Sequence, residues 1–149
     1  MAHNNPHDYK QYRLLLYYKG DISALTLFGL HAYGSVCFPE ALPKLSSVLE
    51  PEECISQKVC IHPAQLVNAV NQLYQLDNDL LQVEQGFTEQ IDAPGGVITV
   101  YMARFKVLDP PHQLLKPYQC ALKTLPELRL QPPAELELLR RAYVKVMES

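Results

Sequence analysis

Two apolar-alternating segments, Leu80 to Asp92 and Val97 to Leu108, constrain the fold of this chain more than any other feature. They are joined by Ala93-Pro94-Gly95-Gly96, so the pattern predicts a long antiparallel hairpin. We expect a type II turn, with Pro94 at its first central position and Gly95 at the second, where φ is positive. At the start of the second segment, the side chains that would point to either face of a strand are apolar. This predicts a central strand covered on both faces.

Two helices are predicted to flank this hairpin. The first runs from Pro63 to Leu76, since proline suits the first turn of a helix. Its apolar face should consist of Leu66, Val70, Leu73 and Tyr74. Its polar face should carry the amides Gln65, Asn68, Asn71 and Gln75.

The second helix, from Pro133 to Met147, has acidic residues in its first turn and basic residues after them, which complements the helix dipole. Glu135 and Glu137 are the acidic residues, and Glu137 lies four residues before Arg141, at ion-pair spacing. The expected apolar stripe comprises Leu136, Leu139, Tyr143, Val146 and Met147.

The other elements follow from shorter patterns. Tyr9 to Tyr18 and Ile22 to Leu30 are interpreted as a strand pair, with one or two helices as the alternative, because periodicity does not separate the two in a continuous apolar run. Leu42 to Leu49 predicts a short helix. Further along we expect a proline-marked loop from Leu108 to Pro117, a short strand at Tyr118 to Leu122 and a helical turn at Leu125 to Leu130.

Length and composition predict one globular domain spanning residues 1–149, with residues 1–8 as a polar lead that could be disordered. Apolar residues make up 48% of the chain and the net charge is -3. Because basic residues do not cluster, we expect no nucleic-acid partner, and because apolar runs are short, no membrane span. The polar N-terminus predicts a cytoplasmic protein whose four cysteines stay reduced.

No segment carries a motif that names a reaction. Cys54, Cys60 and His62 lie close together in the sequence but do not match the spacing of a structural zinc site. We therefore interpret Cys60 as a buried thiol and His62 as the cap of the helix that begins at Pro63. His31 and Cys37 are interpreted as a surface histidine and a core cysteine. We therefore predict no catalytic residue, no metal ligand and no cofactor.

The one candidate ligand-binding pair is Tyr101 with Arg104 on the expected central strand. Arginine offers a planar fork of donors to a phosphate or carboxylate, and the pair could line a pocket. The alternative assigns Tyr101 to core packing and Arg104 to a surface ion pair.

The order of elements from residue 63 to 147 resembles the second half of a Nudix domain. The segments that carry the resemblance are Val83 to Ile91, Pro94 to Phe105, and Leu125-Pro126-Glu127-Leu128 before a Leu-rich helix. The resemblance implies a Nudix-like scaffold. The acidic Nudix signature that holds Mg²⁺ is missing, and the helix in its place carries neutral amides, so we expect no metal-dependent hydrolysis.

These observations predict an α+β fold, with a mixed or antiparallel sheet around the central hairpin and two or three packed helices. The leading hypothesis for function is a non-catalytic domain that binds a small ligand or a protein on a Nudix-like scaffold. One alternative is a diverged nucleoside diphosphate hydrolase that uses Glu84, Glu89 and Asp92, or a thiol enzyme. Another is a homo-oligomeric interaction protein.

Overall fold

The computed structural model describes residues 11–56 and 61–148. The predicted disorder of residues 1–8 and the predicted burial of Cys60 lie outside these residues. The sheet has the order β3-β5-β6-β1-β2-β7, and β4 also pairs with β6. The strands are β1 (Tyr12–Lys19), β2 (Thr26–Leu30), β3 (Ser47–Val48), β4 (Leu81–Val83), β5 (Glu89–Ala93), β6 (Gly96–Phe105) and β7 (Ala121–Lys123).

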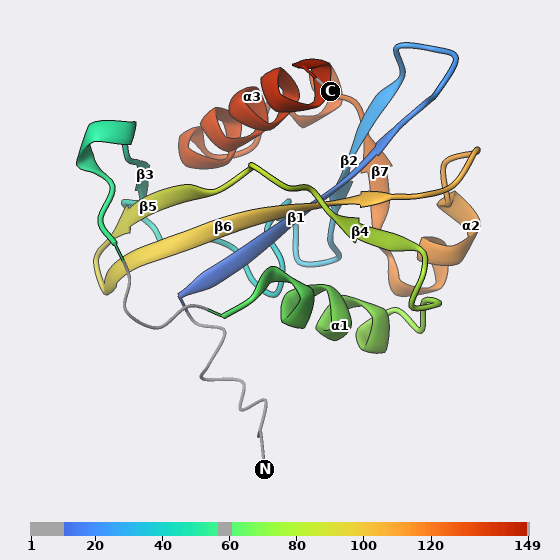
Figure 1. Cartoon of the computed structure of the whole chain (residues 1–149), viewed down its shortest axis with the longest axis horizontal. Helices are drawn as coiled ribbons and strands as arrows, with labels where there is room; N and C mark the ends of the chain where they lie inside the picture. The colour runs from blue at the N-terminus through green and yellow to red at the C-terminus, as the bar shows by residue number, and fades with distance from the viewer. Residues whose placement is uncertain (1–10, 57–60, 149) are drawn as a thin grey trace.

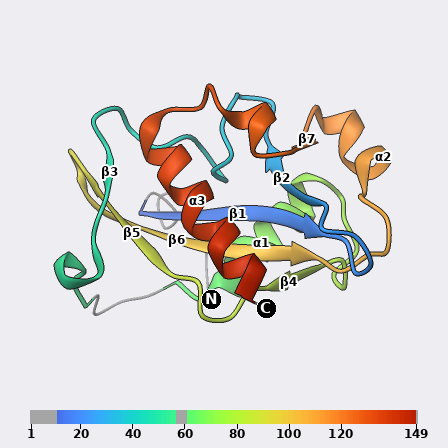
Figure 2. The ribbon, with the colours of Figure 1, turned by 90° about the horizontal axis from the view of Figure 1, so that it is seen from above.

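Helices cover both faces of this sheet (Figures 1 and 2). Helix α1 (Pro63–Leu73) packs on one face and α3 (Pro133–Glu148) on the other, while the short α2 (His112–Leu115) precedes β7. Single 3₁₀ turns occupy Pro51–Glu53, Lys116–Tyr118 and Pro126–Leu128. The mixed sheet packed by helices confirms the predicted α+β class. In the described parts of the chain, no helix is both long and apolar enough to cross a membrane.

The centre of the sheet is the parallel pair of β1 and β6, in which Tyr12 lies opposite Thr99 and Tyr17 opposite Arg104. Side chains alternate between the faces, so Leu14 joins the cluster under α1 while Leu15 joins the cluster under α3. The central-strand prediction for β6 is confirmed, because β6 pairs with β1, β4 and β5.

The predicted hairpin is only partly correct. Its first arm is split into β4 and β5, both paired antiparallel to β6. Gly86, between them, has a φ of 85°, a left-handed conformation that strands do not use. The type II turn is also wrong, since the positive φ falls on Gly96 instead of Gly95.

The strand pair predicted for the N-terminal part is confirmed, because β1 and β2 are antiparallel. The helix predicted from Leu42 to Leu49 is wrong. Leu45 has a φ of 65°, which a helix does not tolerate, and Ser47 pairs with Asp92 as part of β3. This segment instead crosses toward the edge of the sheet beside α3.

Toward the C-terminus, the loop predicted from Leu108 to Pro117 contains α2, and the short strand starts later than expected, at Ala121. The helical turn predicted at Leu125 to Leu130 is confirmed by the 3₁₀ turn at Pro126–Leu128.

The two long helices begin where predicted, but their buried faces differ from the prediction. His62 caps α1, because its Nδ1 accepts a 3.1 Å hydrogen bond from the Ala64 amide. Leu73, predicted in the core, is 52% exposed, while Asn71, predicted on the polar face, is buried. In α3, the buried residues are Glu135, Leu138, Leu139, Ala142 and Val146.

Candidate functional site

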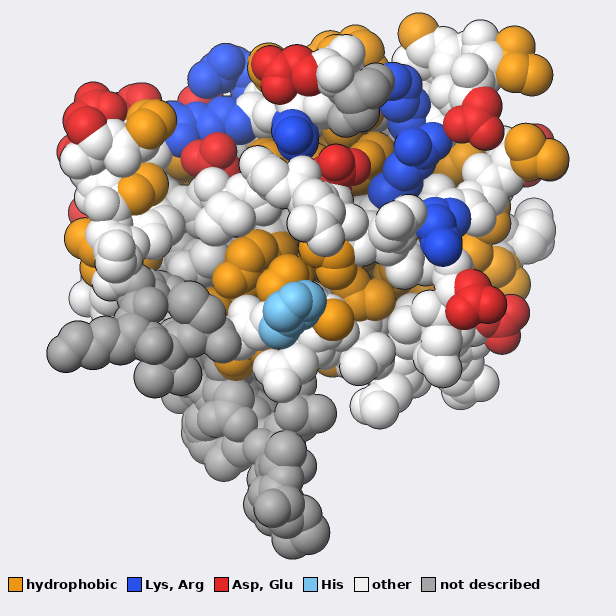
Figure 3. Space-filling view, in the orientation of Figure 1, with side chains coloured by type: hydrophobic (Ala, Val, Ile, Leu, Met, Phe, Trp, Pro, Cys, Tyr) orange, Lys and Arg blue, Asp and Glu red, His pale blue; other side chains and the backbone are white. Residues whose placement is uncertain are grey.

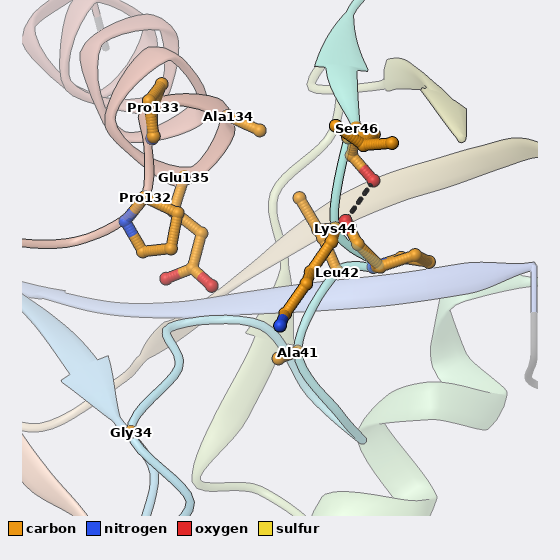
Figure 4. Close-up of a pocket in the computed structure, with 11 residues that line it drawn as sticks. Gly34, Ala41, Leu42, Lys44, Ser46, Pro132, Pro133, Ala134 and Glu135 are labelled. Carbon is orange, nitrogen blue, oxygen red and sulfur yellow. Dashed lines mark hydrogen bonds between the residues drawn. The ribbon is translucent and has the colours of Figure 1, made fainter. Parts of the chain in front are cut away.

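A cavity of about 330 Å³ lies between the segment that follows β2 and the first turn of α3 (Figure 4). Its wall on the α3 side comes from Pro132 to Glu135. The facing wall is formed by residues 41–46, with Gly34 at one end. These two segments are far apart in sequence, and the sheet brings them together because β3 pairs with β5 while α3 packs above the same strands.

The chemically distinctive group of this cavity is the carboxylate of Glu135, whose residue is only 2% exposed. Its Oε2 accepts a 2.7 Å hydrogen bond from the hydroxyl of Ser35. Its Oε1 accepts from the Val36 amide at 3.2 Å and from Nε2 of Gln131 at 2.8 Å. Three of the roughly four acceptor positions of a carboxylate are therefore filled by neutral donors.

No basic side chain within residues 11–56 and 61–148 forms an ion pair with Glu135. Buried carboxylates in proteins are usually paired with a cation or protonated, because desolvation of a lone charge is costly. Glu135 thus brings a carboxyl group without a basic partner among the described residues to the wall of a cavity. This is the property expected of a binding group.

The rest of the wall is mainly apolar. Leu42, Pro43, Leu45, Pro132 and Pro133 line it. Lys44 is exposed on the wall that faces Glu135, and Figure 4 shows its side chain extending along the cavity. The turn that carries Lys44 is held by a 2.5 Å hydrogen bond from the Ser46 hydroxyl to the Pro43 carbonyl.

Sequence reasoning placed Glu135 in the first turn of the helix but did not identify it as a site residue. The position of Glu135 along the helix is the sequence feature that could have identified it as a site residue. Glu135 precedes Leu138, Leu139 and Ala142 by three, four and seven residues, so it lies on the buried stripe of α3. An acidic residue on an apolar stripe is a candidate binding group.

The structure does not bring Tyr101 and Arg104 together, because residues three apart on a strand lie on opposite faces. Tyr101 is on the α1 face and stacks on Tyr12, with ring centroids 6.3 Å apart. Arg104 is on the α3 face and donates to the Lys19 carbonyl at 3.2 Å and to Asp21 at 3.1 Å.

Arg104 lies in an open hollow of about 340 Å³ that Gln82 and Lys106 also line. Figure 3 shows Lys and Arg side chains near the C-terminal end of α3 and near β4. The guanidinium of Arg104 is already held by Asp21 and by a backbone carbonyl, so an anion would have to compete with these partners.

His31 is not the surface residue that we predicted. It is buried, as is Cys37, and its Nδ1 lies 2.6 Å from the Tyr74 hydroxyl and 3.9 Å from Sγ of Cys120. Burial lowers the pKa of His31 to about 4 and raises the pKa of Cys120 to about 11. A nucleophilic cysteine needs the opposite shifts, so this pair does not have the properties of an activated thiol.

The acids of the hydrolase alternative are separated. Glu84 accepts a hydrogen bond from the Tyr17 hydroxyl, Glu89 pairs with Arg141 at 2.7 Å, and Asp92 is exposed. In the portion of the chain that the structure describes, no three His, Cys, Asp or Glu residues are grouped so that they could hold a metal ion.

No model of a known protein family matches this chain, and none of the curated proteins is similar to it.

Proposed function

We propose that the protein is a non-catalytic domain that binds a small ligand in the cavity beside Glu135. The observation that carries this proposal is a buried carboxylate on the wall of a cavity, with no cationic partner among the described residues. The cavity volume of about 330 Å³ is within the usual range for small-molecule sites. An apolar wall with a few polar groups is also typical of such sites.

The proposed scaffold is Nudix-like. The order of α1, β5, a Pro-Gly turn, β6 and α3 supports this part of the proposal. Helix α1 presents Gln65, Asn68 and Gln72 to solvent, and neutral amides bind Mg²⁺ poorly. We therefore expect no Mg²⁺-dependent hydrolysis of nucleoside diphosphate compounds, which a phosphate-release assay would check.

A matched pair of substitutions tests the binding function. Ala134 follows Pro133 in the first turn of α3 and lines the cavity, whereas Ala64 follows Pro63 in the first turn of α1 and is exposed. Ala134→Trp should fill the cavity, and Ala64→Trp should leave it open.

The measurement is protein-observed NMR with a library of small polar fragments. Shifts should concentrate in residues 34–46 and 132–135 of the wild type and of Ala64→Trp, and they should disappear in Ala134→Trp. The proposal is wrong if no fragment perturbs these residues, or if the responding residues lie around Arg104 instead.

A further inference from the structure

We propose that the ligand of this cavity is a small zwitterion, an α-amino acid with an apolar side chain. Its ammonium group would bind Glu135 and its carboxylate would bind Lys44. This inference rests on the proposed function, because it assigns a ligand class to the same cavity.

The ammonium group is indicated by the environment of Glu135. Ser35, Val36 and Gln131 supply three neutral hydrogen bonds, which leaves about one acceptor position of the carboxylate for a ligand. An ammonium group would fill that position with a charge-assisted hydrogen bond and would also supply the missing counter-charge. A neutral donor would supply only the hydrogen bond.

The carboxylate group is indicated by Lys44 on the facing wall. Lys44 forms no ion pair with another described residue, and its side chain is exposed at the cavity. Figure 4 shows Lys44 and Glu135 on facing sides of the cavity. A simple amine would be repelled by Lys44, and a simple carboxylate would be repelled by Glu135. A ligand that carries both charges satisfies both residues.

The apolar side chain is indicated by the walls and the size of the cavity. Leu42, Pro43 and Pro132 offer hydrocarbon surface without donors on their side chains. A volume of about 330 Å³ is near the lower end of the usual range for ligand sites, which suits a molecule of amino-acid size.

Three probes with the same branched hydrocarbon separate the charge requirements. L-leucine carries both charges, isoamylamine carries only the ammonium group, and isocaproate carries only the carboxylate. In NMR titrations of the full chain that follow residues 34–46 and 132–135, L-leucine should bind at least about tenfold more tightly than either analogue.

Two substitutions with matched controls test the two residues. Glu135→Gln and Lys44→Met should each weaken L-leucine binding by about tenfold or more. Glu52→Gln and Lys116→Met remove exposed charges outside the cavity and should leave binding unchanged. If Glu135→Gln does not fold, Lys44→Met still tests whether the ligand is a zwitterion. Lys44 is exposed, so its substitution should not prevent folding.

The zwitterion is excluded if isoamylamine or isocaproate binds as tightly as L-leucine, or if Lys44→Met leaves L-leucine binding unchanged. It is also excluded if fragments of another class bind the cavity and L-leucine does not, which would leave the binding function standing. If neither L-leucine nor any fragment perturbs the cavity, the binding function itself fails.

Discussion

Nδ1 of His31 and the hydroxyl oxygen of Tyr74 lie 2.6 Å apart and form a buried hydrogen bond that connects the end of β2 to the end of α1. The two rings are also stacked, with centroids 5.8 Å apart. Nε2 of His31 is buried without a hydrogen-bond partner among the described residues. With both ring nitrogens protonated, the imidazolium would therefore carry a buried N–H at Nε2 with no acceptor among the described residues.

The burial of His31 predicts a loss of stability in mild acid. Its pKa is about 4 in the folded protein, against an ordinary value of 6.5, so the unfolded chain takes up the proton first. The stabilisation is fully present above pH 6.5 and is lost as the pH falls toward 4, by about 3 kcal/mol in total. Urea unfolding between pH 4 and pH 8 measures this dependence.

The double substitution His31→Phe with Tyr74→Phe should flatten that dependence, because it removes the titrating ring and its partner together. His112→Gln changes an exposed histidine and should keep the wild-type slope. An unchanged slope in the double variant would show that other groups cause the acid sensitivity.

The buried face of α1 predicts unequal costs for two leucines. Leu66→Ala should destabilise the protein by about 2–5 kcal/mol, since Leu66 is fully buried in the cluster under α1. Leu73→Ala should cost less than about 1 kcal/mol, because Leu73 is 52% exposed. Chemical denaturation measures both, and equal costs would contradict the burial of Leu66 and the exposure of Leu73.

Arg141 connects α3 to the edge of the sheet through hydrogen bonds. It donates to Glu137 at 2.7 Å, to Glu89 at 2.7 Å and to the Leu49 carbonyl at 2.9 Å. Arg141→Met should cost about 2 kcal/mol, because it leaves the partly buried Glu89 carboxylate and the Leu49 carbonyl without this donor.

Arg140→Met is the matched control, since Arg140 is an exposed neighbour that contacts only Glu137 among these partners. It should change the unfolding free energy by less than about 1 kcal/mol. Hydrogen bonds from Arg140 and then Arg141 lower the pKa of Glu137 to about 2. That pKa should rise in both variants, and NMR titration of the carboxyl group would show it.

The cysteines should differ in reactivity. Cys37 and Cys120 are buried, and burial raises the pKa of both thiols, whereas Cys54 is exposed. In a Cys60→Ser background, a thiol reagent should modify one cysteine quickly, and Cys54→Ser should abolish this fast phase. Fast modification that persists in the double variant would contradict the burial of Cys37 and Cys120.

The sequence was most informative where one local pattern decides the structure. The apolar run after Gly96 follows a Pro-Gly turn and predicted a strand covered on both faces, and β6 is that strand. The start of α1 was equally clear, because Pro63 suits a first turn and His62 can cap it.

The sequence was least informative where contacts between distant segments determine which side chains are buried. Both Val67 and Leu73 fit an apolar face for α1, and the helix buries Val67 while Leu73 is exposed and Tyr74 contacts His31. The burial of Glu135 depends on donors from Ser35 and Val36, about one hundred residues away, and no local pattern encodes that meeting.

The parallel pairing of β1 with β6 has a consequence for the order of events during synthesis. Tyr12 leaves the ribosome early, yet its partner Thr99 is added only after most of the chain has been made. β1 is almost entirely buried, and β2 pairs only with Tyr17 to Lys19, so most of β1 has no strand on its β6 side until residues 96–105 have been added. We therefore expect the apolar side chains of β1 to be open to contact with other chains for longer during synthesis than those of β6, which meet a finished partner strand as soon as they are made.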